Sequence, residues 1–248
     1  LMIFYLYSRR RAFVAGLVLA TGAGAAQAQT FPNRPIQIIV GFAAGTTTDT
    51  IARVAAEHLR VKLGQPVIVV NKPGANGVIG ATEVLRAPAD GHTLLATNTS
   101  SMTVNPHLYR KLGYQMSDFA PVAMVTSAPL ILTVNPANER TGSIRTVADL
   151  IAYGKGNPGA LSYAAAGPGN ITGLTFRILN KHAGIKANEV LYKSAVASQL
   201  GVLGKEVDAF IDTPLAVPPI KAGKLTATKI GYEWRVTEEN LVRFLNGN

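Results

Sequence analysis

The sequence predicts an α/β protein built from two series of alternating strands and helices. Short apolar runs rich in β-branched residues alternate with longer segments whose apolar residues recur at helical spacing. Several of the predicted strands are followed by a glycine-rich turn and then by residues that favour helix N-termini. This alternation predicts mostly parallel sheets with helices on their faces.

The composition is that of a folded protein without cysteine. Hydrophobic residues make up 48% of the 248 residues and charged residues 15%, which supplies enough apolar side chains for a sizeable core. The absence of cysteine excludes disulfides and thiolate metal sites. The formal net charge is +10, but the basic residues are dispersed and form no basic helix with interleaved aromatic residues. We therefore expect small anionic ligands and no binding of nucleic acid.

Residues 1–28 have the pattern of an export signal. Arg9, Arg10 and Arg11 precede a short apolar run at residues 12–20, and small residues follow as far as Ala28. A membrane anchor is the alternative, but the run is too short to span a bilayer comfortably. We expect cleavage after Ala28 and a periplasmic mature protein, exported by either the general secretion or the twin-arginine route.

The first series of elements starts with a strand, a turn of small residues and a helix. Residues 36–40 have the length and β-branched content of a buried strand. Small residues follow at 43–45, and Ile51, Val54, Ala55 and Leu59 then fall on one helical face. The later elements of this series are expected to be strands at 67–70, 93–97, 121–126 and 130–134, and a helix at 78–86.

The second series repeats the same arrangement without a detectable sequence repeat. Helices are expected at 147–153, 171–183, 195–203 and 214–222, and strands at 161–164, 190–192 and 207–211. A second glycine-rich turn, residues 165–170, links the strand at 161–164 to the following helix. Two turns of this kind that faced each other would hold an acid with a carboxylate at each end.

The turn at residues 43–49 is the clearest candidate for anion binding. Small residues let the backbone approach a ligand, and Thr46, Thr47, Thr48 and Asp49 are residues typical of helix N-termini. The free N–H groups and the positive dipole end of a helix suit a carboxylate or a phosphate. An ordinary strand–turn–helix unit without a ligand explains the pattern equally well.

Catalytic and cofactor motifs are not evident in the sequence. Residues 167–173 come near the dinucleotide fingerprint, but the last glycine is one position late and no ribose-binding acid is evident. No nucleophile–base pair stands out, and the four histidines lack ligand spacing. We therefore expect no catalytic activity, no metal and no cofactor.

The remaining polar candidates each have two interpretations. Asp49 is more simply explained as a helix cap than as a base. Asp212 follows an apolar strand and either contacts a ligand or caps the next helix. Thr99, Ser100 and Ser101 either bind a ligand or satisfy their own loop, and we favour ligand binding.

A series of motifs along the chain resembles one receptor family. The motifs lie at residues 31–36, 40–45, 49–53, 63–67, 71–75, 90–94, 105–109, 118–122, 157–164 and 220–225. In this order they resemble the substrate-binding receptors of tripartite tricarboxylate transporters, also called the Bug family. The likeness covers nearly all of the chain from residue 31 to residue 225.

The resemblance implies a two-lobed periplasmic-binding-protein-like fold of type II, in which each lobe is a mostly parallel sheet flanked by helices. The lobes would be residues 29–127 and 128–227, after the signal at 1–28 and before a tail at 228–248. The ligand would be a small carboxylic acid, such as a di- or tricarboxylate, an amino acid or an aromatic acid. A monomeric receptor would deliver it to the permease subunits of a membrane transporter.

The resemblance also implies which residues line the cleft between the lobes. The turns at residues 43–49 and 165–170 would hold the carboxylates at helix N-termini. The expected ligand-binding residues are Phe42, Ala44, Gly45, Thr46, Thr47, Asp49, Thr99, Ser100, Ser101, Ala166, Gly167, Gly169, Asn170 and Asp212.

The sequence departs from the family pattern at three positions near these turns and at its end. Thr46 stands where a second glycine is usual, Pro168 where asparagine is usual, and Gly173 where histidine is common. Pro168 removes a backbone donor. From residue 229 the chain does not resemble the family's continuation, so we expect a truncated or frameshifted C-terminus and an incomplete return to the first lobe.

Two other functions remain open from the sequence. An exported α/β hydrolase would need a nucleophile and base in the cleft, which we do not find. A periplasmic sensor that presents a carboxylate to a signalling kinase would carry the same binding residues as a transport receptor, and the sequence does not separate the two.

Overall fold

The computed structural model describes residues 30–213 and the backbone of residues 226–229. The pattern of contacts separates residues Leu1–Asn33 from a second unit, Arg34–Asn248. The expected signal at 1–28, the expected helix at 214–222 and most of the expected tail at 228–248 lie outside the described residues.

The unit from Arg34 contains a first sheet with strand order β2-β1-β3. Both pairings of this sheet are parallel, and Ile36 lies opposite Val67 in β2. The elements are β1 (Ile36–Val40), α2 (Thr47–Leu63), β2 (Val67–Asn71), α3 (Val78–Leu85), β3 (Thr93–Ala96) and α4 (Asn105–Leu108), with short helical turns η1 (Ala75–Gly77), η2 (Ser100–Val104) and η3 (Met116–Asp118).

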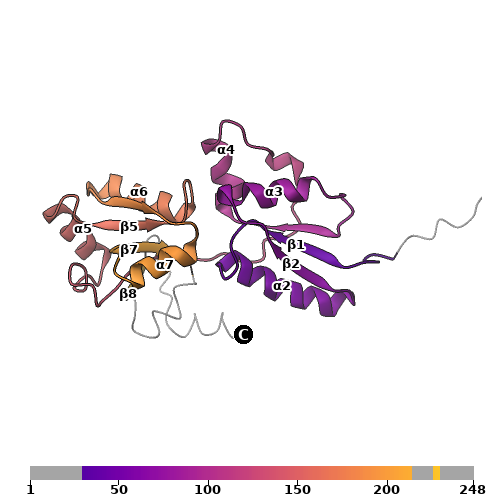
Figure 1. Ribbon diagram of the computed structural model, residues 1–248, viewed down its shortest axis with the longest axis horizontal. Coiled ribbons are helices and arrows are strands. Elements are labelled where there is room, and N and C mark those ends of the chain that lie inside the picture. The colour runs from indigo at the N-terminus through magenta and orange to yellow at the C-terminus, as the bar shows by residue number, and fades with distance from the viewer. Residues whose placement is uncertain (1–29, 214–225, 230–248) are drawn as a thin grey trace, which may run out of the picture. The chain divides into compact units, whose positions relative to one another are not determined.

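Two helices cover the first sheet on opposite sides (Figure 1). Ile38 and Val40 of β1 pack against Ala52 and Ala56 of α2, because residues two apart in a strand share a face. Helix α3 contacts β1 and β3. A Cβ on Gly80 of α3 would lie 2.6 Å from the backbone of residue 41, so glycine is needed for this helix to approach the sheet.

The second sheet has the order β6-β5-β7-β4-β8 and is mixed. Strand β5 pairs in parallel with β6 and β7, whereas β4 is antiparallel to both β7 and β8. The alternation of strands and helices did not predict the direction of β4. The elements are β4 (Ile131–Val134), α5 (Val147–Gly156), β5 (Ser162–Ala165), α6 (Ile171–Ala183), β6 (Asn188–Leu191), α7 (Ala195–Leu203), β7 (Ala209–Asp212) and β8 (Thr226–Lys229).

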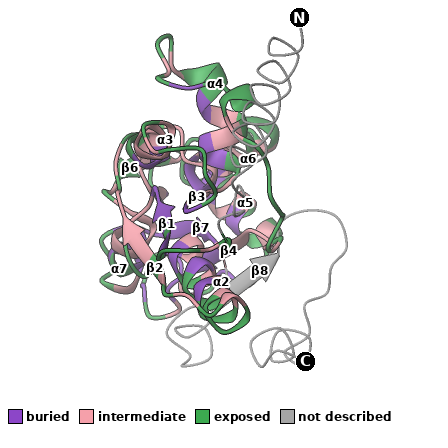
Figure 2. Cartoon of the chain, turned by 90° about the vertical axis from the view of Figure 1, so that its right-hand side faces the viewer, coloured by how far each residue is buried: buried purple, intermediate pink, exposed green. Residues whose placement is uncertain are grey.

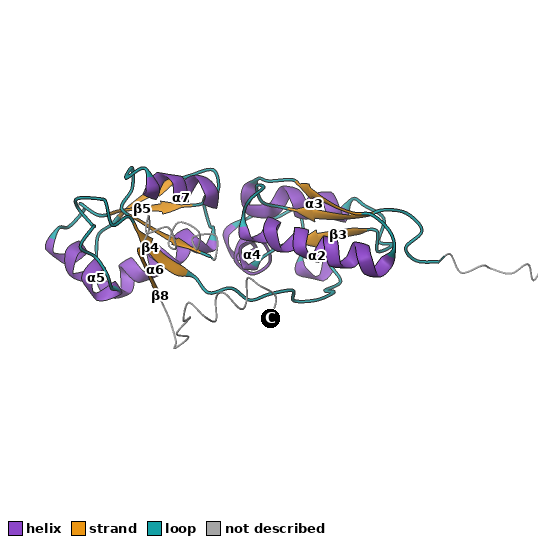
Figure 3. Ribbon diagram, turned by 90° about the horizontal axis from the view of Figure 1, so that it is seen from below, coloured by secondary structure: helices purple, strands orange, loops and turns teal. Residues whose placement is uncertain are grey.

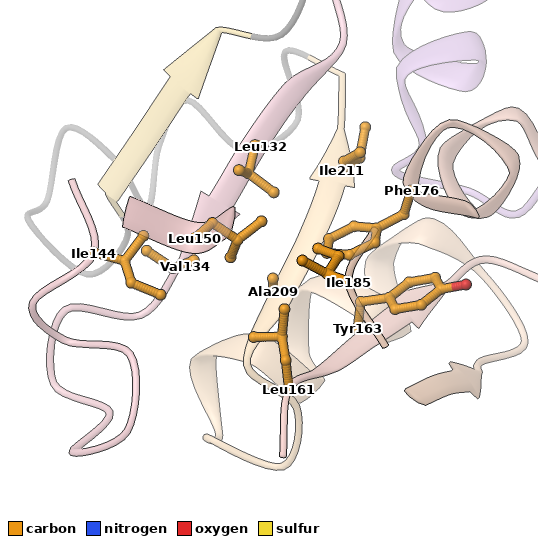
Figure 4. Packing of buried hydrophobic residues seen from close by; sticks show 10 residues of the cluster. All are labelled: Leu132, Val134, Ile144, Leu150, Leu161, Tyr163, Phe176, Ile185, Ala209 and Ile211. Atoms are coloured by element: carbon orange, nitrogen blue, oxygen red, sulfur yellow. The ribbon is translucent and has the colours of Figure 1, made fainter. Parts of the chain in front are cut away.

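Helices α6 and α7 pack on opposite faces of the second sheet (Figures 1 and 3). Tyr163 of β5 faces Phe176 of α6, and their rings stack with centroids 4.1 Å apart. The next residue, Ala164, faces Val202 of α7, as the alternation of a strand requires. Figure 4 shows the larger of these two clusters, and Figure 2 shows that the buried residues concentrate on strands such as β1 and β7.

The prediction of a strand within residues 121–126 is wrong. The described chain between η3 and β4 contains no strand, and Val122 and Met124 are 83% and 86% exposed. A strand needs a partner for its backbone as well as β-branched residues, and the described residues supply no such partner here. The other strands and helices expected within the described residues are confirmed, with bounds that shift by a few residues.

Candidate functional site

The turn between β1 and α2 is closed by its own side chains. Gly45 adopts a left-handed backbone, with φ of +80°, and this residue type allows it without strain. The backbone N–H and the hydroxyl of Thr46 both donate to the carbonyl of Ala43, at 3.3 and 2.8 Å. Thr46 precedes α2 but makes no side-chain cap to that helix, so its hydroxyl shapes the turn instead.

Asp49 is almost fully buried and holds this turn through its carboxylate. Its carboxylate accepts hydrogen bonds from the Gly45 N–H at 2.9 Å and the Asn71 amide at 2.8 Å, and it pairs with Arg53 at 3.0 Å. Burial alone raises the pKa of Asp49, but the bonds from Arg53, Gly45 and Asn71 outweigh it and lower the pKa. All of these bonds favour the ionised form, so Asp49 serves the structure of the turn rather than proton transfer.

The second turn leads from β5 into α6 and contains two glycines with left-handed backbones. Gly167 and Gly169 have φ of +97° and +72°. The Asn170 side chain accepts hydrogen bonds from the N–H and hydroxyl of Thr172 at 3.1 and 2.9 Å, which caps α6. The next N–H, of Ile171, donates to the hydroxyl of Ser100 at 3.1 Å. A residue of the first series therefore completes the helix start of the second.

Asn76 connects the same two parts of the chain. Its side-chain amide donates to Asn105 at 2.8 Å and to the carbonyl of Gly169 at 3.1 Å. Its side-chain oxygen accepts from Asn170 at 3.3 Å. The carbonyl of Asn76 in turn accepts from Ser101 at 3.0 Å. Asn76 thus joins the loop after β2 to the turn before α6.

A cavity of about 530 Å³ opens beside these turns, which is within the range of small-molecule sites. Three helices begin at its wall: α2 at Thr47, α6 at Ile171 and α7 at Ala195. Lys193 also lines it, so the cavity combines positive helix ends with a cation. The other lining residues are Gly41, Phe42, Ala43, Thr46, Thr48, Pro73, Gly74, Ala75, Asn76, Gly77, Asn98, Tyr109, Ala166, Gly167, Pro168, Asn170, Thr172, Leu191, Tyr192, Ser194, Asp212 and Thr213.

Half of the sequence-predicted site residues line this cavity and half do not. Those at the wall are Phe42, Thr46, Thr47, Ala166, Gly167, Asn170 and Asp212. Those that are not at the wall are Ala44, Gly45, Asp49, Thr99, Ser100, Ser101 and Gly169. Three of these residues, Asp49, Ser100 and Ser101, are buried. Their side chains form hydrogen bonds that hold the surrounding loops.

Sequence reasoning missed two stretches of the wall, residues 73–77 and 191–195. The first stretch follows β2 and the second begins at the last residue of β6, so both lie at a strand's carboxyl end, where open α/β sheets bind ligands. The second stretch carried a usable signal, because Ser194 caps α7 by accepting from the N–H of Ala197 at 3.2 Å.

Asp212 is the one acidic side chain among the described residues that line the cavity. Its Oδ1 accepts from the N–H of Thr213 at 2.7 Å and from the Thr213 hydroxyl at 3.3 Å. Burial raises the pKa of Asp212 to about 7, although the two bonds from Thr213 act in the opposite direction. The Thr213 hydroxyl also bonds to the Thr47 hydroxyl, which ties the end of β7 to the start of α2.

Comparison with known families matches residues 51–242 to the tripartite tricarboxylate transporter family receptor. The chain belongs to this receptor family. The match extends beyond residue 225, where the motifs that we recognised in the sequence end.

A UPF0065 protein of Bordetella pertussis is 36% identical to this receptor over 228 residues, which are 90% of this chain and 68% of the relative. Among solved structures, the periplasmic binding protein BugD is 34% identical, with a TM-score of 0.72 over 79% of this chain and 65% of BugD. The fold is therefore periplasmic-binding-protein-like. The receptor spans about two thirds of the length of these relatives.

Two further solved relatives hold small carboxylates. A protein from R. palustris with adipate is 30% identical, with a TM-score of 0.75 over 79% of this chain and 65% of that protein. MatC from Rhodopseudomonas palustris, with bound malate, is 30% identical, with a TM-score of 0.71 over 79% of this chain and 66% of MatC. None of the helices in the described part of the chain is long and apolar enough to cross a membrane.

Proposed function

We propose that this chain is a periplasmic receptor that captures a small carboxylic acid without chemical change and delivers it to a tripartite tricarboxylate-type permease. In this proposal residues 29–127 and 128–227 form the two lobes, the ligand binds between them and the receptor acts as a monomer. Residues 1–28 serve as the export signal.

The observation that carries the proposal is the meeting of three helix starts at one cavity. Helices α2, α6 and α7 each begin with a residue of the cavity wall. The first N–H groups of a helix have no backbone partner within it, and its dipole favours anions there. In α6 the N–H groups of Ile171 and Thr172 are already bonded to Ser100 and Asn170, so this helix contributes its dipole rather than these donors. Lys193 adds a full positive charge at the same wall. Such a wall suits a ligand with more than one carboxylate, and solved relatives with adipate and malate agree with this chemistry.

The class of receptor, rather than of enzyme, is supported by the roles of the buried polar residues. The Asp49 carboxylate accepts hydrogen bonds on both oxygens and so holds a turn. The Ser100 hydroxyl accepts a hydrogen bond from the first N–H of α6. Both residues are buried and neither lines the cavity, so neither is placed to act there as a base or a nucleophile. BugD is a periplasmic binding protein and MatC is described with bound malate, which agrees with this view.

Thermal unfolding with a panel of acids tests the proposal. The panel contains succinate, malate, adipate, citrate, aspartate, glutamate, nicotinate and benzoate. At one hundred times its Kd, a bound acid stabilises the folded state by about 2.7 kcal/mol, which raises the Tm by roughly 5–10 °C for a protein of this size. Absence of a shift with every acid would contradict the proposed function.

A pair of lysine variants localises the binding to this cavity. Lys193→Gln removes the cation at the wall and is expected to weaken binding by roughly two- to fivefold, because Lys193 is exposed to solvent. Lys186→Gln removes an exposed cation that does not line the cavity and is the matched control. Equal losses of affinity in the two variants would show that the acid responds to overall charge and not to this site.

A further inference from the structure

Among the described residues, one oxygen of the Asp212 carboxyl has hydrogen-bond partners and the other has none. Oδ1 accepts two bonds from Thr213, whereas Oδ2 is buried and has no hydrogen-bond partner among the described residues. Asp212 itself is 0% exposed. A buried oxygen without a partner is costly, so it calls for a physical explanation, such as a contact with a ligand.

The wall of the cavity indicates the kind of ligand that would supply that contact. Asp212 belongs to the wall of the cavity but is fully buried, so a ligand that fills the cavity reaches this carboxyl once the wall around it shifts. The other polar features of the wall suit an anion, namely the three helix starts and Lys193. An ionised Asp212 would repel such a ligand, whereas a neutral carboxyl would donate a hydrogen bond to it.

We propose, on the basis of the proposed function, that Asp212 contacts the ligand as a neutral carboxyl whose Oδ2–H donates to a carboxylate oxygen of the acid. Capture of a carboxylate by the ionised form then takes up one proton from solvent, and no covalent bond forms or breaks. Asp212 is in this way a specificity-determining residue, because it favours acids that place a second carboxylate opposite the end of β7.

The ionisation of Asp212 agrees with this role. Burial places its pKa at about 7, so that both forms are populated at neutral pH before the ligand arrives. A bound anion would favour the neutral form further. The other titratable groups of the described wall are Tyr109, Tyr192 and Lys193, and none of them contributes to the shift of Asp212.

Calorimetric titration with succinate, malate and adipate tests the inference. With a pKa of about 7, we expect the affinity of the wild-type protein to fall about tenfold between pH 6 and pH 8. Heats measured in two buffers of different ionisation enthalpy should show uptake of about half a proton per ligand at pH 7. This measurement needs no variant, so it stands even if a substitution disturbs folding.

Asp212→Asn is expected to raise the affinity for the acid at high pH rather than to abolish binding. The amide keeps an acceptor for Thr213 and presents a permanent donor in place of Oδ2–H. We expect this variant to bind as the wild type does at pH 6, about tenfold more tightly than the wild type at pH 8, and without proton uptake. Asp90→Asn is the control, since Asp90 is partly exposed, lies outside the wall and has a pKa of about 2.

The outcomes separate this inference from the proposed function. Binding of an acid without proton uptake, or proton release on binding, would overturn the role of Asp212 and leave the receptor function intact. Weaker binding by Asp212→Asn at both pH values would also overturn it, because the neutral form would then not be the binding form. Failure of every acid in the panel to bind would remove the proposed function, and this inference with it.

Discussion

Asp212→Asn should change how the stability of the folded protein depends on pH, whether or not a ligand is present. The wild-type carboxyl is buried at the end of β7, and its pKa rises from 3.8 to about 7 on folding. The folded state therefore binds more protons than the unfolded state between these values. Stability from this group is fully present below pH 3.8 and is lost as the pH rises through 7.

The size of the effect follows from the two pKa values. Linkage gives a loss of roughly 2.5 kcal/mol in the free energy of unfolding between pH 5 and pH 8, from Asp212 alone. Asparagine does not titrate, so the variant should lack this loss. All other residues are the same in both proteins, so their contributions cancel in the comparison.

Urea unfolding at pH 5 and pH 8, followed by circular dichroism, measures this difference. Relative to the wild type, Asp212→Asn should gain roughly 2.5 kcal/mol on going from pH 5 to pH 8. Asp90→Asn should show no such gain, since the pKa of Asp90 is about 2. If the wild type and Asp212→Asn differ by the same amount at both pH values, Asp212 does not titrate in this window and the reasoning is refuted.

Three further changes test the packing around the site. In urea unfolding at pH 7, Asp49→Asn should lower the free energy of unfolding by about 1–3 kcal/mol. The loss should be much smaller at pH 3, because the bonds that lower the pKa of Asp49 stabilise its ionised form. Ser100→Ala removes the acceptor of the first α6 N–H and should lower the free energy of unfolding by about 1–3 kcal/mol. Thr99→Ala, at the exposed neighbouring position, should change it by less than about 0.5 kcal/mol. Phe176→Ala should lower the free energy of unfolding by about 3–5 kcal/mol, and Ile178→Ala on the exposed side of α6 by much less; equal losses would contradict the described core.

The elements that the sequence predicts well are those whose signals are local. Helix α6 runs over residues 171–183 as expected, because Asn170 caps its start and a glycine follows its end. Strand β1 coincides with the β-branched run at 36–40. Each of these signals lies within a few residues of the boundary that it sets.

The errors arise where a residue's role depends on distant partners. Residues 121–126 have the composition of a strand but lack a neighbour to pair with among the described residues. The sequence also gives no sign that the Ser100 hydroxyl accepts a hydrogen bond from the N–H of Ile171, 71 residues away. Nor does the sequence indicate that the Asn76 amide donates to the carbonyl of Gly169, 93 residues away. Composition and spacing do not encode such pairings.

Asp49 and Asp212 show what the sequence leaves undetermined about a buried aspartate. Both are buried aspartates near the start of a predicted helix, and both allowed a capping role. Asp49 receives bonds on both oxygens and an ion pair, which keep it ionised and committed to its turn. Asp212 receives bonds on one oxygen from Thr213 and has no ion pair among the described residues, so burial dominates its pKa. Its second oxygen is buried behind the cavity wall without a partner among those residues. The number of donors around each carboxyl, rather than its position in the sequence, decides whether it supports the fold or meets the ligand.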